Sequence, residues 1–163
     1  FPKEYSRASH LKYDISLLFM KCYYQLKEDD HDLSIKTVKE FLTLLLPQLN
    51  KSDYIFRLSP ETFGIIVTSQ GENAITELGE KILFKVRDKK IWVDGEAFDF
   101  YAVMGLVNSE FLSPDIDNVI KLGEKTIKHA RLKGPNQMMN YRNVLEEENK
   151  ADRQLDMLDS KQQ

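Results

Sequence analysis

The chain has 163 residues, 30% of them charged and 42% hydrophobic, which is typical of one globular domain with some solvated flanking sequence. Its net charge of -3 excludes a long-range attraction to phosphate backbones, so no nucleic-acid partner is expected. Apolar runs such as residues 41–46 are far shorter than the roughly 20 residues of a membrane span, so no span is expected either.

The cysteine and histidine content limits the disulfides and metal sites that the chain can form. Cys22 is the single cysteine, which excludes an intrachain disulfide and favours a cytoplasmic location. The three histidines, His10, His31 and His129, have no partner at metal-ligand spacing. We therefore expect neither a bound metal nor a cofactor.

The first predicted elements are a strand and a helix. The apolar run from Tyr13 to Met20 has the length of a strand and the composition of one buried on both faces. The hydroxyl of Ser34 can cap a helix, which Pro47 would end or kink. Between them, apolar residues recur at helical spacing, at Val38, Phe41, Leu42 and Leu45. We expect this face to pack on the sheet, with Leu42 as a core anchor.

A hairpin and a second helix follow. Residues 53–57 and 63–67 are strand-like segments separated by five residues that include a proline, the pattern of a β-hairpin. Asn73 can cap the next helix, which would end near Asp88. The apolar face of this helix is expected at Ile75, Leu78, Ile82 and Val86.

Two more strands, a third helix and a short strand complete the order. Asp94-Gly95 favours a type I′ turn between two strands, because both turn residues need positive φ. Ser113-Pro114-Asp115 predicts a helix start, with a hydroxyl cap and an acid beside the positive helix end. The face of that helix would consist of Ile116, Ile120, Gly123, Ile127 and Ala130, with Ile127 as a core anchor and the two small residues allowing close approach. An edge strand is expected after Gly134.

This order predicts an α/β (α+β) fold of the ferredoxin-like kind, a central, mostly antiparallel sheet flanked by helices and extended by a hairpin. From residue 143 the sequence is charged and places Leu145, Leu155 and Leu158 too sparsely for a core face. We therefore expect a domain over residues 1–142 and a solvated helical or disordered tail over residues 143–163.

The element order and two motifs resemble the GGDEF family, the diguanylate cyclase domains of bacterial cyclic-di-GMP signalling. That family shows an Arg two residues before Gly-Gly-Asp/Glu-Glu-Phe and an aliphatic strand. Here Arg57 and Leu58 precede Ser59-Pro60-Glu61-Thr62-Phe63, and Gly64-Ile65-Ile66-Val67 follows. The family's C-terminal motif is similar to residues 123–136, which keep an Ala, a basic residue, a Gly and an Asn at the same spacing, at Ala130, Arg131, Gly134 and Asn136. The resemblance covers about residues 1–141 and implies the nucleotidyl cyclase palm fold.

The resemblance fails at the positions that carry chemistry. Cyclases of the family hold GTP with Mg²⁺, which requires clustered carboxylates. The family's first-strand Asp-x-Asp falls on Lys21-Cys22-Tyr23, or on Leu18 and Met20 in a shifted register, and neither register restores the acids. Glu61 alone stands at a metal-ligand position, and Pro60 stiffens a turn that the family builds from glycines. We expect no catalytic residue and no enzymatic activity.

Three residues are candidate remnants of nucleotide binding. Asp53 ends Asn50-Lys51-Ser52-Asp53, where the family's product-binding site has Arg-x-x-Asp, so the guanidinium fork that could bond guanine is missing. Arg57 can equally be a solvated strand end, and Arg131 can be the cationic end of a helix.

The sequence thus favours a catalytically inactive GGDEF-like domain that binds a protein partner or relays a signal from an adjacent sensor domain. Two alternatives stay open: a degenerate receptor for cyclic-di-GMP or GTP, and a divergent nucleotidyl cyclase with ligands at unusual positions. The altered hairpin is the candidate docking face, because rigid apolar turns and aromatic side chains favour interfaces. The alternative is that the turn changed without gaining a function after activity was lost, since exposed prolines are ordinary in turns. Its candidate residues are Tyr54, Phe56, Leu58 and Pro60.

Overall fold

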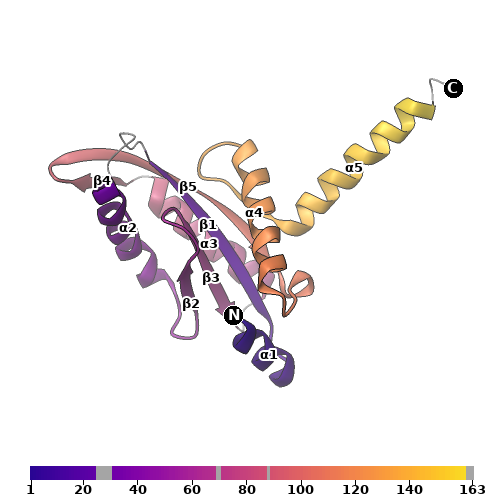
Figure 1. Ribbon diagram of the computed structural model, residues 1–163, viewed down its shortest axis with the longest axis horizontal. Coiled ribbons are helices and arrows are strands. Elements are labelled where there is room, and N and C mark those ends of the chain that lie inside the picture. The colour runs from indigo at the N-terminus through magenta and orange to yellow at the C-terminus, as the bar shows by residue number, and fades with distance from the viewer. Residues whose placement is uncertain (25–30, 69–70, 88, 161–163) are drawn as a thin grey trace.

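The computed structural model describes residues 1–24, 31–68, 71–87 and 89–160 (Figure 1). Its helices are α1 (Pro2–Leu11), α2 (His31–Leu45), α3 (Glu72–Arg87), α4 (Ile116–Leu132) and α5 (Tyr141–Ser160), with short 3-10 helices η1 (Leu46–Gln48) and η2 (Ser109–Phe111). Its strands are β1 (Ile15–Tyr24), β2 (Tyr54–Arg57), β3 (Thr62–Thr68), β4 (Lys90–Val93), β5 (Glu96–Val107) and β6 (Met138–Asn140).

The strands described in the structure form one sheet in the order β2-β3-β1-β5-β4, with β6 also beside β5. Their pairings are antiparallel except for that of β5 with β6, which is parallel. Helices cover both sides of the sheet (Figure 1). The predicted fold class is confirmed.

Successive residues of the central strand point into two different cores. Leu18 and Met20 face α2 and α3 in what we call the first core. Leu17 and Phe19 face α1, α4 and the beginning of α5 in the second core. Since all four are fully buried, this part of β1 has no solvated face, which explains its apolar run.

The apolar faces of α2 and α3 pack into the first core, as their spacing predicts. Leu42, however, is only partly buried, so its assignment as a core anchor is wrong. Phe41, one residue earlier, is the anchor of α2. It is 1% exposed, and its ring centre lies 5.4 Å from that of Phe63 and 5.3 Å from that of Phe100.

The predicted capping residues are wrong at all three helices, whereas the predicted acid at the start of α4, Asp115, is confirmed. Because α2 begins at His31 and α3 at Glu72, Ser34 and Asn73 lie inside the helices rather than before them. At α4 the cap is Asp115, whose carboxylate accepts hydrogen bonds from the backbone N–H groups of Asp117 and Asn118. A carboxylate at this position also interacts favourably with the positive helix end, an advantage that the hydroxyl of Ser113 lacks.

The first strand is displaced from its predicted position. It runs from Ile15 to Tyr24 rather than from Tyr13 to Met20, because the long strand β5 pairs with it as far as Tyr24. The predicted turn between β4 and β5 is confirmed: Asp94 and Gly95 have φ of 52° and 85°, both in the left-handed region.

Gly123 lets α4 approach the sheet closely. A Cβ built on this residue would lie 2.4 Å from ring carbons of Phe19, closer than real carbon atoms approach. The predicted role of this glycine in close packing is therefore confirmed, and Ala130 is likewise fully buried in the second core.

The sequence after residue 142 continues α5 as far as Ser160, and residues 161–163 lie outside the described part of the chain. The first turns of α5 are solvated on one face only, because Val144 is fully buried and Leu145 packs against the second core. Leu145 thus contacts the core although the leucine spacing predicted no core face, and the contribution of Val144 was missed. The division between residues 142 and 143 stays a proposal.

Candidate functional site: a polar pocket and an apolar groove

A pocket of about 310 Å³ lies where the end of β1, the β2–β3 hairpin and α4 meet. We call it the polar pocket; its lining residues are Lys21, Tyr23, Thr62, Glu124, Ile127, Lys128 and Arg131. Lys21 and Tyr23 share one side of β1 because they are two residues apart in a strand. Glu124, Lys128 and Arg131 come from one face of α4 because they are spaced by four and three residues.

Lys21 lies opposite the one carboxylate that the hairpin motif retains. Its Nζ is 4.0 Å from Oε2 of Glu61 and 5.5 Å from the centre of the Tyr23 ring. Because the two charged side chains are 35% and 47% exposed, the pair stabilises the fold by only about 0–1 kcal/mol. The position of Lys21 matters more than the strength of the pair, because an ammonium group beside Glu61 repels a divalent cation.

Tyr23 and Arg131 form the wall of the pocket opposite the hairpin. The guanidinium carbon of Arg131 lies 4.3 Å from the centre of the Tyr23 ring, and Tyr23 stacks on Tyr101 with ring centres 5.1 Å apart. Burial raises the pKa of the Tyr23 hydroxyl above its ordinary value of 10.0, and the charge of Arg131 opposes that rise. Tyr23 is therefore a neutral phenol at neutral pH and supplies no anionic oxygen for a metal.

Arg57 closes the hairpin turn. Its side chain donates hydrogen bonds to the carbonyl oxygens of Ser59, at 3.0 Å, and Pro60, at 3.0 Å. The turn is also closed through its backbone, where the N–H groups of Leu58 and Ser59 donate to the carbonyl oxygen of Thr62. Arg57 thus has a structural role, because its side chain holds the hairpin turn closed.

Asp53 and Asn136 also have structural partners. The carboxylate of Asp53 accepts hydrogen bonds from the backbone N–H groups of Asn50 and Thr68, which fixes the loop before β2. Asn136 has a left-handed φ of 53°, and its Oδ1 accepts a hydrogen bond from the N–H of Ala102 in β5. Of the three candidate remnants, only Arg131 lines the polar pocket.

The family's first-strand Asp-x-Asp can be aligned with β1 in two registers, and the structure bears on the choice between them. Leu18 and Met20 are fully buried in the first core, on the side of the sheet away from α4. Lys21 pairs with Thr62 of the hairpin and lines the polar pocket together with Tyr23. The register that places the acids at Lys21 and Tyr23 is therefore the one compatible with a site at the hairpin.

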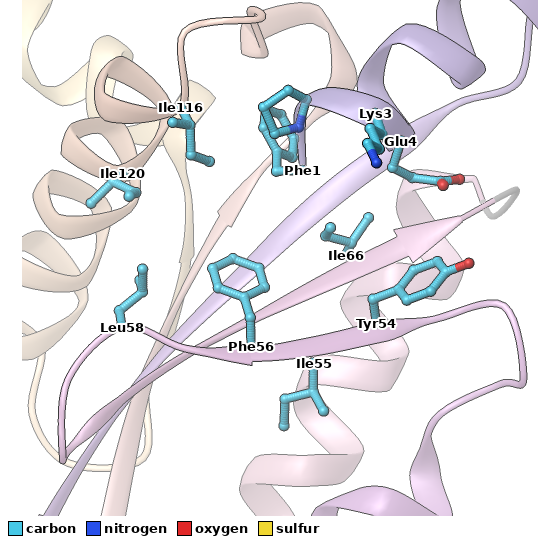
Figure 2. A pocket seen from close by; sticks show the side chains of 11 residues that line it. Phe1, Lys3, Glu4, Tyr54, Ile55, Phe56, Leu58, Ile66, Ile116 and Ile120 are labelled. Atoms are coloured by element: carbon cyan, nitrogen blue, oxygen red, sulfur yellow. The ribbon is translucent and has the colours of Figure 1, made fainter.

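A second, more apolar cavity lies beside the strand β2, between α1 and α4. We call it the groove; it has a volume of about 480 Å³ and is lined by Phe1, Pro2, Lys3, Glu4, Tyr54, Ile55, Phe56, Leu58, Ile66, Ile116 and Ile120. Figure 2 shows Phe56 and Leu58 pointing toward α4, while Ile55 points to the opposite side of the sheet. This alternation follows from the two-residue repeat of a strand.

The groove unites most of the predicted docking residues. Tyr54, Phe56 and Leu58 line it, whereas Pro60 stands at the tip of the turn and is not among its lining residues. Sequence reasoning missed the contribution of α1 and α4, because Phe1 and Ile120 approach β2 only through the tertiary fold. The apolar spacing on α4 could have indicated this contribution, but Ile116 and Ile120, which were predicted to face the core, line the groove.

Solved structures with the same arrangement are known. The active GGEEF domain of a diguanylate cyclase from Vibrio cholerae is similar with a TM-score of 0.69 and 16% identity, over 85% of this chain and 90% of that one. The chain has the fold of GGDEF domains. The GGDEF domain of DgcB from Caulobacter crescentus, in complex with c-di-GMP, is similar with a TM-score of 0.67 and 10% identity, over 86% of this chain and 85% of that one.

A third structure with the GGDEF fold contains a bound protein. The diguanylate cyclase SiaD from Pseudomonas aeruginosa, in complex with its activator SiaC, is similar with a TM-score of 0.73 and 15% identity. The similarity covers 85% of this chain and 54% of SiaD. No protein-family model and no curated protein matches the sequence.

Two further features of the described residues concern metal ions and membranes. Among these residues, no group of three or more His, Cys, Asp or Glu side chains is placed to hold a metal ion. None of the helices seen in the same residues has the length and apolar character needed to cross a membrane.

Proposed function

We propose that this chain is a catalytically inactive GGDEF-like signalling domain that acts by binding a protein partner or an adjacent sensor domain, in the cytoplasm. The observation that carries the proposal is the Lys21–Glu61 ion pair in the polar pocket. In the cyclases that the sequence resembles, this place holds acids and Mg²⁺. Here a fixed ammonium group and a neutral phenol, Tyr23, stand where metal-assisted phosphoryl transfer requires carboxylates.

The purified domain is expected to form no cyclic-di-GMP from GTP with either Mg²⁺ or Mn²⁺. A heat-inactivated sample sets the background, and an active diguanylate cyclase with the same fold serves as the positive control. Product above the background would contradict the proposal and would favour the divergent cyclase.

The degenerate receptor is the second candidate function, and the charge of the polar pocket favours it. Lys21, Lys128 and Arg131 line the pocket together with Glu124, and Glu61 lies beside it, so cationic side chains are in excess around this space of about 310 Å³. Calorimetric titration with GTP and cyclic-di-GMP, each with and without Mg²⁺, separates this candidate from the first. Binding without turnover would identify a receptor.

For partner binding, we propose the groove and the hairpin tip as the docking face. The groove offers aromatic and aliphatic side chains beside a strand at the edge of the sheet, and Tyr54 in it is 48% exposed. Apolar anchors in a preformed cavity are typical of interface hot spots. Binding of an activator by SiaD is compatible with a protein-binding role for this fold.

A Leu58→Asp change is expected to weaken partner capture by about tenfold or more, because it places a charge in the centre of the apolar face. Capture is compared by affinity purification with quantitative mass spectrometry. Trp92→Asp is the matched control, since Trp92 is also apolar and exposed but lies on β4, at the other end of the strand order. If the folded Leu58→Asp variant retains every partner of the native chain, the groove is not the docking face. The turn sequence has then changed without gaining a binding function.

A further inference from the structure

In the part of α5 whose side chains the structure describes, the buried residues lie in the first turns. Val144 is fully buried, whereas every residue from Asn149 to Gln154 is exposed. In Figure 1 the later part of α5 extends away from the sheet and from the other helices. The orientation of the extended part is therefore set by the contacts of the first two turns.

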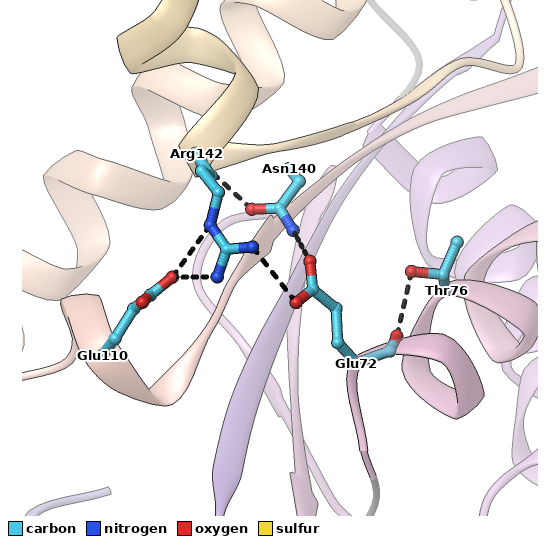
Figure 3. A network of polar contacts seen from close by, with 5 residues as sticks. All are labelled: Glu72, Thr76, Glu110, Asn140 and Arg142. Atoms are coloured by element: carbon cyan, nitrogen blue, oxygen red, sulfur yellow. Dashed lines mark hydrogen bonds and ion pairs between the residues drawn. The ribbon is translucent and has the colours of Figure 1, made fainter.

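The beginning of α5 is held by a network around Arg142. The guanidinium group of Arg142 donates to the carboxylate of Glu110 in η2 and lies 3.4 Å from the carboxylate of Glu72 at the start of α3. The side-chain amide of Asn140 donates to the same Glu72 at 2.8 Å (Figure 3). The hydrogen bond to Glu110 is the main cause that raises the pKa of Arg142 above its ordinary value, so the guanidinium group keeps its charge at neutral pH.

A second set of charges, which we call the clasp, joins the next turn of α5 to α4. The clasp consists of Lys125, His129 and Lys133, spaced by four residues along α4, and of Glu147 and Glu148 on α5. Lys125 Nζ lies 2.7 Å from Glu148 Oε2, and Lys133 Nζ lies 2.7 Å from Glu147 Oε1. His129 lies between the two lysines with its side chain 23% exposed.

Both ring nitrogens of His129 face carboxylates. Its Nδ1 is 3.6 Å from Glu147 Oε2, and its Nε2 is 3.8 Å from Glu148 Oε1. A neutral imidazole has one N–H donor and one lone-pair acceptor, so one of these nitrogens would turn a lone pair toward an anionic oxygen. Only the doubly protonated ring presents a donor to each carboxylate.

We propose that the clasp is a pH-responsive coupling that holds the projecting helix α5 against α4 when His129 is protonated and loosens it when His129 is neutral. Histidine is the side chain whose charge normally changes near neutral pH. The positive charge is present at low pH and lost as the pH rises, so the attachment of α5 weakens with rising pH.

Two other charged groups of the clasp have pKa values that are shifted away from neutral pH. The hydrogen bond from Lys133 is the main cause that lowers the pKa of Glu147 below its ordinary value of 4.5, so the contribution of Glu147 is lost only in acid. The hydrogen bond to Glu148 raises the pKa of Lys125 above its ordinary value of 10.5. Lys128 and Arg131, also on α4, line the polar pocket instead.

Hydrogen exchange of the full chain, followed by NMR, measures the opening of α5. Protection factors, which correct for the intrinsic pH dependence of exchange, are compared for the amides of residues 147–154. From about pH 6 to about pH 8 we expect protection to fall by about two- to fivefold, the range of a partly exposed ion pair. A change of equal size in the amides of β1 would reflect global stability and would overturn the proposal.

Three variants make the test specific to the clasp. His129→Arg keeps a permanent charge and is expected to abolish the pH response with α5 protected throughout, whereas His129→Gln is expected to leave α5 less protected at both pH values. His10→Gln, on α1, is the matched control and should show the native response. A pH response that persists in His129→Arg, or is absent from the native chain, overturns the proposal.

Discussion

Replacing Phe41 by alanine is expected to lower the free energy of unfolding by about 3–5 kcal/mol. Phe41 is 1% exposed and packs between the rings of Phe63 and Phe100, which lie on two different strands. Removal of the ring loses its transfer free energy and leaves a cavity that two flanking rings cannot close without moving off their own contacts. Urea denaturation followed by circular dichroism measures the change.

Leu46→Ala is the matched control for this substitution. Leu46 follows α2 directly and is 51% exposed, so the same kind of truncation should change stability by less than about 0.5 kcal/mol. A loss at Phe41 no larger than that of the control would show that the ring is not enclosed by the sheet as described.

The fold was largely predictable because its main elements carry strong periodic signals. The apolar faces of α2 and α3 follow from spacing alone, and Asp94-Gly95 fixes the β4–β5 turn through its positive φ values. On α4 the spacing identified Ile127 and Ala130 but missed the fully buried Val119. Boundaries and caps were less predictable, because they depend on tertiary partners. The extension of β1 to Tyr24 requires the length of β5, which no local pattern in β1 contains.

The sites were less predictable than the fold, because each combines residues that are distant in sequence. Lys21 and Glu61 are brought together by the pairing of β1 with β3, and Arg131 reaches Tyr23 only because α4 crosses β1. The motif comparison located the hairpin, but it could not show that Lys21 would face its remaining carboxylate. Val144 illustrates the same limit, since its burial depends on where α5 begins.

The fixed charge of Lys21 should also determine how the polar pocket responds to divalent cations. In the native chain Mg²⁺ and Mn²⁺ are expected to leave the free energy of unfolding unchanged, because the ammonium group already lies 4.0 Å from Glu61. Lys21→Asp places a second carboxylate opposite Glu61, and hard cations prefer such oxygen ligands. The variant is expected to be less stable than the native chain without metal, because two like charges then face each other.

Added Mn²⁺ is expected to reverse that loss in the Lys21→Asp variant. At about ten times the dissociation constant, a ligand that binds only the folded state raises the free energy of unfolding by about 1.4 kcal/mol. Denaturation curves with and without Mn²⁺ measure the effect. Lys21→Ala is the control, since it removes the ammonium group without adding a carboxylate, and it should gain far less. If Lys21→Asp gains nothing from Mn²⁺, or if Lys21→Ala gains as much, then the Lys21 charge is not what excludes a metal from this pocket.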